Sequence, residues 1–346
     1  MKRILLSPLT VVILLLSAFT SYGQTIDQPG AYMTAIANAQ TEMKQKYMAY
    51  VSAVAHGRRA RKIEKMRLAT LESISNCKYK TADINIYKGD NSLRKSSIDY
   101  IDLCYKVFNE DYKHIVDMEE IAEQSYDEMQ AYMMLLEKTN EKLKMASDNM
   151  QTASTEFAKK YNVNLIESSD ELSEKLATAD QLSSYRDKLY LIFYKCNFED
   201  GIMTKAINNK KVKDIEQARS SLVQYATEGL TALNDLRTFQ TDPSLANACR
   251  DVLTFYKKMA ETDAPKITDF FLKEEEFEKT KKTMDAKSDR SKQDIDAYNK
   301  AVKEMNAAVN TFNQANNNIN TSRNKVLANW ENADKVFADT HMPHYK

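Results

Sequence analysis

The chain has 346 residues and equal numbers of basic and acidic side chains, 49 of each. This balance argues against a general nucleic-acid binder, because such proteins carry an excess of basic charge. Only six glycines and five prolines occur, in a chain rich in helix-forming residues. The composition therefore predicts an almost entirely helical protein, long enough for one large core or two smaller ones.

The first 23 residues predict a secretory signal peptide. Lys2 and Arg3 precede an apolar run over Ile4–Phe19, and small residues lead to a cleavage site after Gly23. The run is short for a membrane span, and no cysteine follows the cleavage site directly. We therefore expect a cleaved signal, no lipid anchor and no integral span after cleavage. The processed chain, with 47 basic and 49 acidic residues, is predicted to be periplasmic, secreted or at the cell surface.

A first helical unit is predicted over residues 30–160. Its first helix is expected to end at His56-Gly57, because glycine is a common stop signal. A second helix leads to a turn at Lys88-Gly89, and Asp90 is the candidate N-cap of a third. The fourth helix of the unit is expected to begin near Lys113.

Two long apolar seams dominate the pattern. Apolar residues recur every three or four positions over Ile295–Phe337, and a weaker seam covers Ile115–Phe157. Each segment predicts a helix of roughly 65 Å at 1.5 Å per residue. Because such seams must pack against other helices, the fold class expected is an all-α, elongated helical bundle with two very long helices.

Parts of the chain match each other at an offset of 152 residues. Lys62–Arg67 aligns with Asp214–Arg219, and Asp90–Leu93 aligns with Asp242–Leu245. These matches predict an internal duplication of a four-helix unit. The second unit is then expected over residues 181–339. Residues 161–180 are predicted to be a connector, and residues 340–346 a frayed tail.

Four cysteines leave two alternatives open. In an oxidising compartment they would form disulfides, with three ways to pair. As widely spaced residues in helical patterns they are equally explained as buried free thiols. The residues are Cys77, Cys104, Cys196 and Cys249.

Residues suited to catalysis or metal binding are few. A di-metal carboxylate site in a bundle needs two Glu-x-x-His pairs, and neither His114 nor His341 has a glutamate three positions earlier. Acidic clusters at Glu119–Glu123 and Glu274–Glu276 are typical of solvated helix faces. We therefore predict no catalytic residue, no metal and no cofactor, and an envelope enzyme is the third choice of function.

Two basic runs are candidates for binding an anion such as phosphate, sulfate or an anionic glycan. Both precede or begin a predicted helix, where backbone N–H groups favour negative charge. Ordinary surface charge is the alternative explanation. The candidate residues are Arg58, Arg59, Arg61, Lys210, Lys211 and Lys213.

The seam of the last long helix is interrupted by polar residues. Asn316 and Arg323 occupy apolar positions of the repeat, and Trp330 and Phe337 follow them. Polar seam residues can set the register or oligomeric state of a coiled coil. The interpretation we favour is that the helix extends beyond its bundle and the seam is wet there. Covering Trp330 and Phe337 with a second chain, in a homo-oligomer, is the alternative.

Several motifs resemble a known family. They are Ser52–Gly57, Asn109–Glu120, Thr268–Lys273 and Asp296–Val302. The chain is similar over nearly its whole processed length to an uncharacterised bacterial envelope family named after a leptospiral predicted surface protein. The resemblance implies an envelope location, and it transfers no catalytic or binding residue.

The expected function is therefore non-enzymatic. We predict a structural or interaction protein of the cell envelope that presents helix faces to a protein or glycan partner. The runner-up is an extracytoplasmic ligand-binding module with a pocket between the two helical units, where Tyr185, Tyr190 and Tyr194 are candidate lining residues. Amphipathic packing is the other explanation of these tyrosines.

Overall fold

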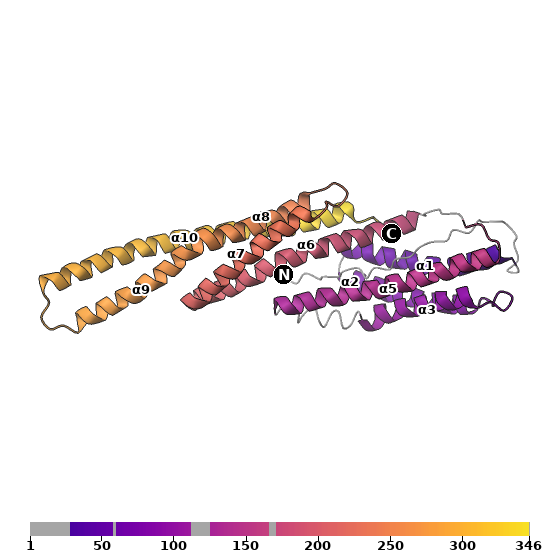
Figure 1. The fold of residues 1–346 in the computed structure, drawn as a ribbon, viewed down its shortest axis with the longest axis horizontal. Coiled ribbons are helices and arrows are strands. Elements are labelled where there is room, and N and C mark those ends of the chain that lie inside the picture. The colour runs from indigo at the N-terminus through magenta and orange to yellow at the C-terminus, as the bar shows by residue number, and fades with distance from the viewer. Residues whose placement is uncertain (1–27, 58–59, 112–124, 166–170, 346) are drawn as a thin grey trace. The chain divides into compact units, whose positions relative to one another are not determined.

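The computed structural model describes residues 28–57, 60–111, 125–165 and 171–345. These residues form helices and no sheet (Figure 1), which confirms the predicted all-α bundle. The predicted signal peptide lies outside them. The chain divides into two compact units, Met1–Asp187 with Ala338–Lys346 (unit 1) and Lys188–Phe337 (unit 2).

Four of the described helices of unit 1 pack against one another in sequence order. α1 lies against α2, α2 against α3, α3 against α5, and α5 also contacts α1 (Figure 1). The α-helical part of α3 is followed by one π-helical turn, η1. The bounds are Pro29–Ala55 for α1, Ala60–Ala82 for α2, Ser92–Lys106 for α3, Val107–Asp111 for η1 and Tyr126–Lys160 for α5.

An aromatic cluster closes one end of this bundle. The ring of Tyr32 in α1 lies 5.2 Å from that of Phe157 in α5 and 5.5 Å from that of Tyr87, which precedes α3. Tyr161 packs edge-on against Tyr87 at 4.9 Å. Because the rings come from both ends of the unit's sequence, they fix the register of α1 and α5.

The helix ends of unit 1 follow the local signals. Gly57 has φ +63° directly after α1, as the predicted glycine stop requires. Lys88 and Gly89 have φ +49° and +81° and form the predicted turn. Asp90 Oδ1 accepts hydrogen bonds from Ser92 N at 3.0 Å and Ser92 Oγ at 2.6 Å. The N-cap residue of α3 is Asn91, so the predicted N-cap at Asp90 is wrong by one residue, although the Asp90 side chain still accepts the first amide of the helix.

The helix predicted over Ile115–Phe157 is wrong at Ser125. This residue is extended, with φ −154° and ψ 163°, and its hydroxyl accepts a hydrogen bond from Glu128 N. It is therefore the N-cap of α5, which begins at Tyr126. The apolar spacing continues across Ser125 although the backbone does not stay helical. Residues 115–124 lie outside the described part of the chain.

Unit 2 contains α7, α8, a π-helical turn, α9 and most of α10. The 50 residues of α10 include all of Ile295–Phe337 in one unbroken helix, which confirms the helix predicted there. The bounds are Val212–Asp235 for α7, Ser244–Lys258 for α8, Met259–Asp263 for η2, Ala264–Asp285 for α9 and Lys292–His341 for α10.

Local features recur at the 152-residue offset noted in the sequence. α3 and α8 have 15 residues each and are followed by η1 and η2. The antiparallel bridges Tyr87–Asp90 and Phe239–Asp242 close equivalent turns. Differences are equally plain, since α5 has 35 residues and α10 has 50. The duplication of a whole four-helix unit stays a prediction.

Two segments differ from the sequence-based expectation. Half of the predicted connector 161–180 is helical, because α6 runs from Glu171 to Asn208. Its first residues belong to unit 1 and the rest, from Lys188, to unit 2. The predicted fraying of residues 340–346 is wrong for Met342, which is 3% exposed, and for Tyr345, whose amide donates to Ser52 Oγ at 3.1 Å.

Candidate functional site

Groups able to hold a metal do not gather in the described ranges. Within them, no cluster of three or more His, Cys, Asp or Glu side chains has a suitable arrangement. Glu274 and Glu275 form ion pairs with Lys210 and Lys279, at 2.8 and 2.7 Å. His114 and the predicted cluster Glu119–Glu123 lie outside the described residues.

The four cysteines are buried free thiols. Burial raises the pKa of Cys77 to about 11 and that of Cys104 and Cys196 to about 12. The pKa of Cys249 is also raised by burial. The reactive thiolate is therefore strongly disfavoured at neutral pH, and these side chains act as small apolar core residues.

The basic residues predicted to bind an anion are placed as follows. Arg61 is exposed on α2, and Lys213 is exposed on α7. Lys210 Nζ lies 2.8 Å from both carboxylate oxygens of Glu274, and Lys211 Nζ lies 3.8 Å from Asp214. The carboxylates beside Lys210 and Lys211 compete with an added anion. Arg58 and Arg59 lie outside the described residues.

A histidine pair binds the C-terminal segment to α1 within unit 1. His56 Nδ1 lies 2.7 Å from Asp339 Oδ1, and the rings of His56 and His344 stack with centroids 3.9 Å apart. The stacked rings and the His56–Asp339 contact therefore hold the C-terminal segment against the end of α1.

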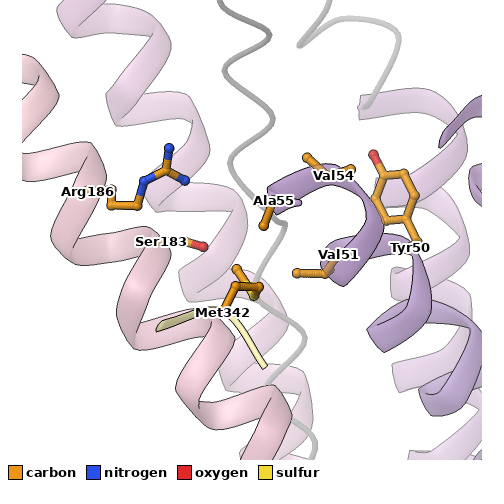
Figure 2. Close-up of a pocket in the computed structure, with 7 residues that line it drawn as sticks. All are labelled: Tyr50, Val51, Val54, Ala55, Ser183, Arg186 and Met342. Atoms are coloured by element: carbon orange, nitrogen blue, oxygen red, sulfur yellow. The ribbon is translucent and has the colours of Figure 1, made fainter. Parts of the chain in front are cut away.

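A small pocket lies among α1, α6 and the C-terminal segment of unit 1. Figure 2 shows Met342 between Ser183 and Arg186 of α6 and the end of α1. The cavity measures about 20 Å³, which is room for roughly one water molecule. Tyr185 is buried in unit 1, and Tyr190 and Tyr194 pack in unit 2, where Tyr190 lies against Phe193. This pocket is too small for a metabolite.

The seam of α10 beyond Asn316 is covered by unit 2 itself, so the predicted wet seam is wrong. Trp330 stacks on Phe193 of α6 with ring centroids 4.9 Å apart. Phe337 packs edge-on against Phe239 at 6.0 Å. Neither ring needs a second chain for its burial. Asn316 is half-buried and makes a long contact, 3.4 Å, with Asn320.

Arg323 has a specific partner on the facing helix. Its Nε and Nη2 donate to the two carboxylate oxygens of Asp200 at 2.7 Å each. The two side chains are 15% and 7% exposed. Burial raises the pKa of Asp200, and the Arg323 guanidinium acts in the opposite direction. The polar seam position therefore fixes α10 against α6.

The segment of unit 2 with the least burial is a two-helix arm. We define the arm as residues 272–307, the second part of α9 and the first part of α10, which run side by side in Figure 1. None of these residues is buried. In α1, by contrast, buried side chains occur along the whole helix. The arm therefore lacks a core of its own.

The arm has an apolar seam that is only half covered. The rings of Phe277 in α9 and Tyr298 in α10 have their centroids 6.0 Å apart. Leu272 and Ile295 are 52% and 43% exposed. The half-buried apolar side chains are Phe277, Met284, Tyr298, Val302 and Met305. Two helices alone cannot cover such a seam on its flanks.

The tip of the arm is a well-defined turn. Ser291 Oγ accepts a hydrogen bond from Asp294 N at 3.1 Å, while Ser291 N donates to Asp294 Oδ2 at 3.0 Å. This reciprocal pair is a capping box at the start of α10. Lys287 pairs with the same carboxylate, and these interactions lower the pKa of Asp294 to about 2.

The base of the arm is anchored in unit 2 by rings and charges. Phe312 of α10 stacks on Phe270 at 4.4 Å and packs against Phe271 at 5.9 Å. Lys210 links α9 to the start of α7 through Glu274. Thr268 donates to Glu216 of α7 at 2.8 Å. The contacts at the base and the capping box at the tip therefore fix both ends of the half-covered seam.

Comparison of the chain with protein-family models, with curated proteins and with solved structures gives no match. Among the described residues, no helix combines the length and the apolar character needed to cross a membrane. The resemblance to the leptospiral surface-protein family stays a prediction.

Sequence reasoning identified the seam of α10 but missed the arm. The missing information was that the described residues leave none of the arm buried, which periodicity does not encode. A signal was nonetheless present in α9, where Glu274, Glu275, Glu276 and Glu278 are followed at once by Lys279, Lys281 and Lys282.

Proposed function

We propose that this chain is a non-enzymatic interaction protein of the cell envelope that docks a protein partner on the arm of unit 2. The observation that carries this proposal is the half-covered apolar seam of residues 272–307, none of which is buried. Exposed apolar side chains with a charged rim are typical of protein interaction sites.

A helical protein partner fits this surface better than a sugar. The apolar side chains of the seam recur every three or four residues along the two neighbouring helices α9 and α10. A further amphipathic helix can pack its own apolar face against them. An envelope location is proposed from the apolar segment Ile4–Phe19 and the basic residues before it.

Site-specific photo-crosslinking in the producing cells tests the proposal. A photoreactive residue replaces Leu272 or Ile295 on the arm, and in matched controls Leu68 or Met145 of unit 1, which are 52% and 65% exposed. We expect covalent protein adducts from the arm positions only. Leu272→Glu with Ile295→Glu should remove the partner without changing the helix content.

Adducts of equal yield from the control positions would contradict the proposal, as would an arm that forms none. Because all four positions are exposed apolar side chains, the comparison separates a specific surface from general stickiness.

A further inference from the structure

The charges of the arm are divided between its tip and its base. Residues 279–297, at the tip, contain six basic and four acidic side chains. Residues 272–278 and 298–307, at the base, contain three basic and five acidic side chains. The tip therefore has a formal net charge of about +2 and the base about −2, although the chain as a whole is nearly neutral.

The same division is visible within α9. Glu278 and Lys282 are both exposed and lie four residues apart, on one side of the helix. If two copies of α9 run antiparallel, the glutamate run over residues 274–278 of each copy lies level with the lysines over residues 279–282 of the other. A surface of this kind is complementary to itself, as an isologous interface requires.

The apolar seam leads to the same partner. A second arm has the same length and the same spacing of Phe277, Met284, Tyr298 and Val302. Two antiparallel arms would make a local four-helix arrangement, in which each pair of helices covers a flank of the other. Leu272 and Ile295, the most exposed large apolar residues there, would lose contact with water.

We propose that the arm is a self-association surface, and that its occupant is the arm of a second copy of this chain in antiparallel orientation. The inference rests on the proposed function and names its partner. In this dimer the tip of each arm docks on the base of the other arm, so two tip–base contacts form.

Analytical ultracentrifugation of the purified chain over about 1–100 μM, a range in which moderate self-association is visible, gives the first test. We expect a concentration-dependent dimer that weakens in high salt, because exposed charge pairs are screened. A chain that stays monomeric throughout this range overturns the proposal.

Charge reversal gives the second test. The tip variant is Lys281→Glu with Lys282→Glu, and the base variant is Glu276→Lys with Glu278→Lys; all four positions are exposed. Each variant alone should dimerise at least tenfold more weakly than the unmodified chain. An equimolar mixture should recover dimers, because the reversed tip meets the reversed base. Leu68→Glu in unit 1 is the matched control and should leave the dimer unchanged.

Circular dichroism and the fluorescence of Trp330 verify that each variant is folded. Failure of the mixture to recover dimers excludes tip–base docking. If the purified chain is monomeric while Leu272 crosslinks to a different envelope protein, the self-association is wrong and the proposed function stands. If neither dimers nor crosslinks form, both are wrong.

Discussion

Arg323 of α10 holds Asp200 of α6 through two parallel hydrogen bonds of 2.7 Å, with both side chains largely buried. Removing one partner leaves a buried charge without its counter-charge, which typically costs about 3–5 kcal/mol. We expect Arg323→Met alone to destabilise unit 2 on that scale. The double variant with Asp200→Leu should be less destabilised than the single one, because no charge remains.

Trp330 is the single tryptophan of the chain and lies in unit 2, so its fluorescence during denaturant unfolding measures this effect. Lys300→Met, which affects an exposed pair with Glu304, is the control and should change little. Equal destabilisation by both variants would mean that Arg323 contributes no more than a surface charge.

At Gly229 of α7, a change to alanine would improve helix propensity but would also crowd the neighbouring side chains. A Cβ there would lie 2.9 Å from Leu253 Cδ1 and 3.0 Å from Ile192 Cγ2. Overpacking costs about 1–3 kcal/mol, which exceeds the gain of roughly 1 kcal/mol in helix propensity. We expect Gly229→Ala to lower the denaturation midpoint of unit 2. Gly201→Ala in α6, where nothing lies within 4 Å, should raise it.

Thr241 occupies a left-handed backbone position, with φ +68°. A β-branched residue is disfavoured there, and the equivalent turn of unit 1 has Gly89 with φ +81°. We expect Thr241→Gly to stabilise unit 2 by about 0.5–1 kcal/mol, measured by Trp330 fluorescence, because relief of strain exceeds the added chain entropy. Gly89→Thr should destabilise unit 1, and a stabilising Gly89→Thr would contradict this account.

Asp90 makes the turn before α3 sensitive to acid. Hydrogen bonds from Lys160 and from Ser92 hold the pKa of Asp90 far below its ordinary value. Ionised Asp90 therefore stabilises the fold above the unfolded-state pKa of about 3.9, and this contribution is lost as the pH falls through the lower folded-state pKa. We expect Asp90→Asn to speed hydrogen exchange of the α3 amides near pH 5.

The difference between Asp90→Asn and the unmodified chain should shrink as the pH approaches about 2, after correction for the intrinsic exchange rate. Asp148→Asn removes an exposed pair with Lys144 and is the matched control, with little effect expected. A difference that stays constant with pH would show that the Asp90 charge is irrelevant.

Met342 fixes the C-terminal segment to unit 1. It is 3% exposed, and the neighbouring Tyr345 amide donates to Ser52 Oγ. We expect Met342→Ala to weaken docking by about 2 kcal/mol, because burial of a methionine side chain contributes on this order. Faster hydrogen exchange of the Tyr345 amide would measure the effect. Val336→Ala, at an exposed position of α10, should leave that amide unchanged.

The amino-acid pattern was sufficient to predict the helices but not their surroundings. The seam over Ile295–Phe337 gave α10 correctly, because side-chain periodicity reports the helix itself. The same periodicity continued through Ser125, where a capping bond from Glu128 N starts α5 instead. Local hydrogen bonding competes with the apolar pattern, and spacing alone does not show which prevails.

Whether a side chain is buried depends on segments that are distant in sequence. The candidate site is defined by the low burial of the arm, so it could not be predicted from local spacing. Arg323 was expected in a wet seam because its partner, Asp200, is 123 residues away. The arm was missed for the opposite reason, since its seam has the same spacing as covered seams. The charge division between Glu278 and Lys282 could be read from the sequence, but its meaning required knowing that the described part of the chain leaves this part of α9 exposed.

The contact between His56 and Asp339 spans 283 positions of the chain, and both residues belong to unit 1. All of unit 2 is synthesised between them. Among the described helices α1 is synthesised first, and its neighbour His56 cannot contact Asp339 until all of unit 2 has been synthesised. Loop closure over such a distance is slow, so we expect this contact to form as the final step of folding.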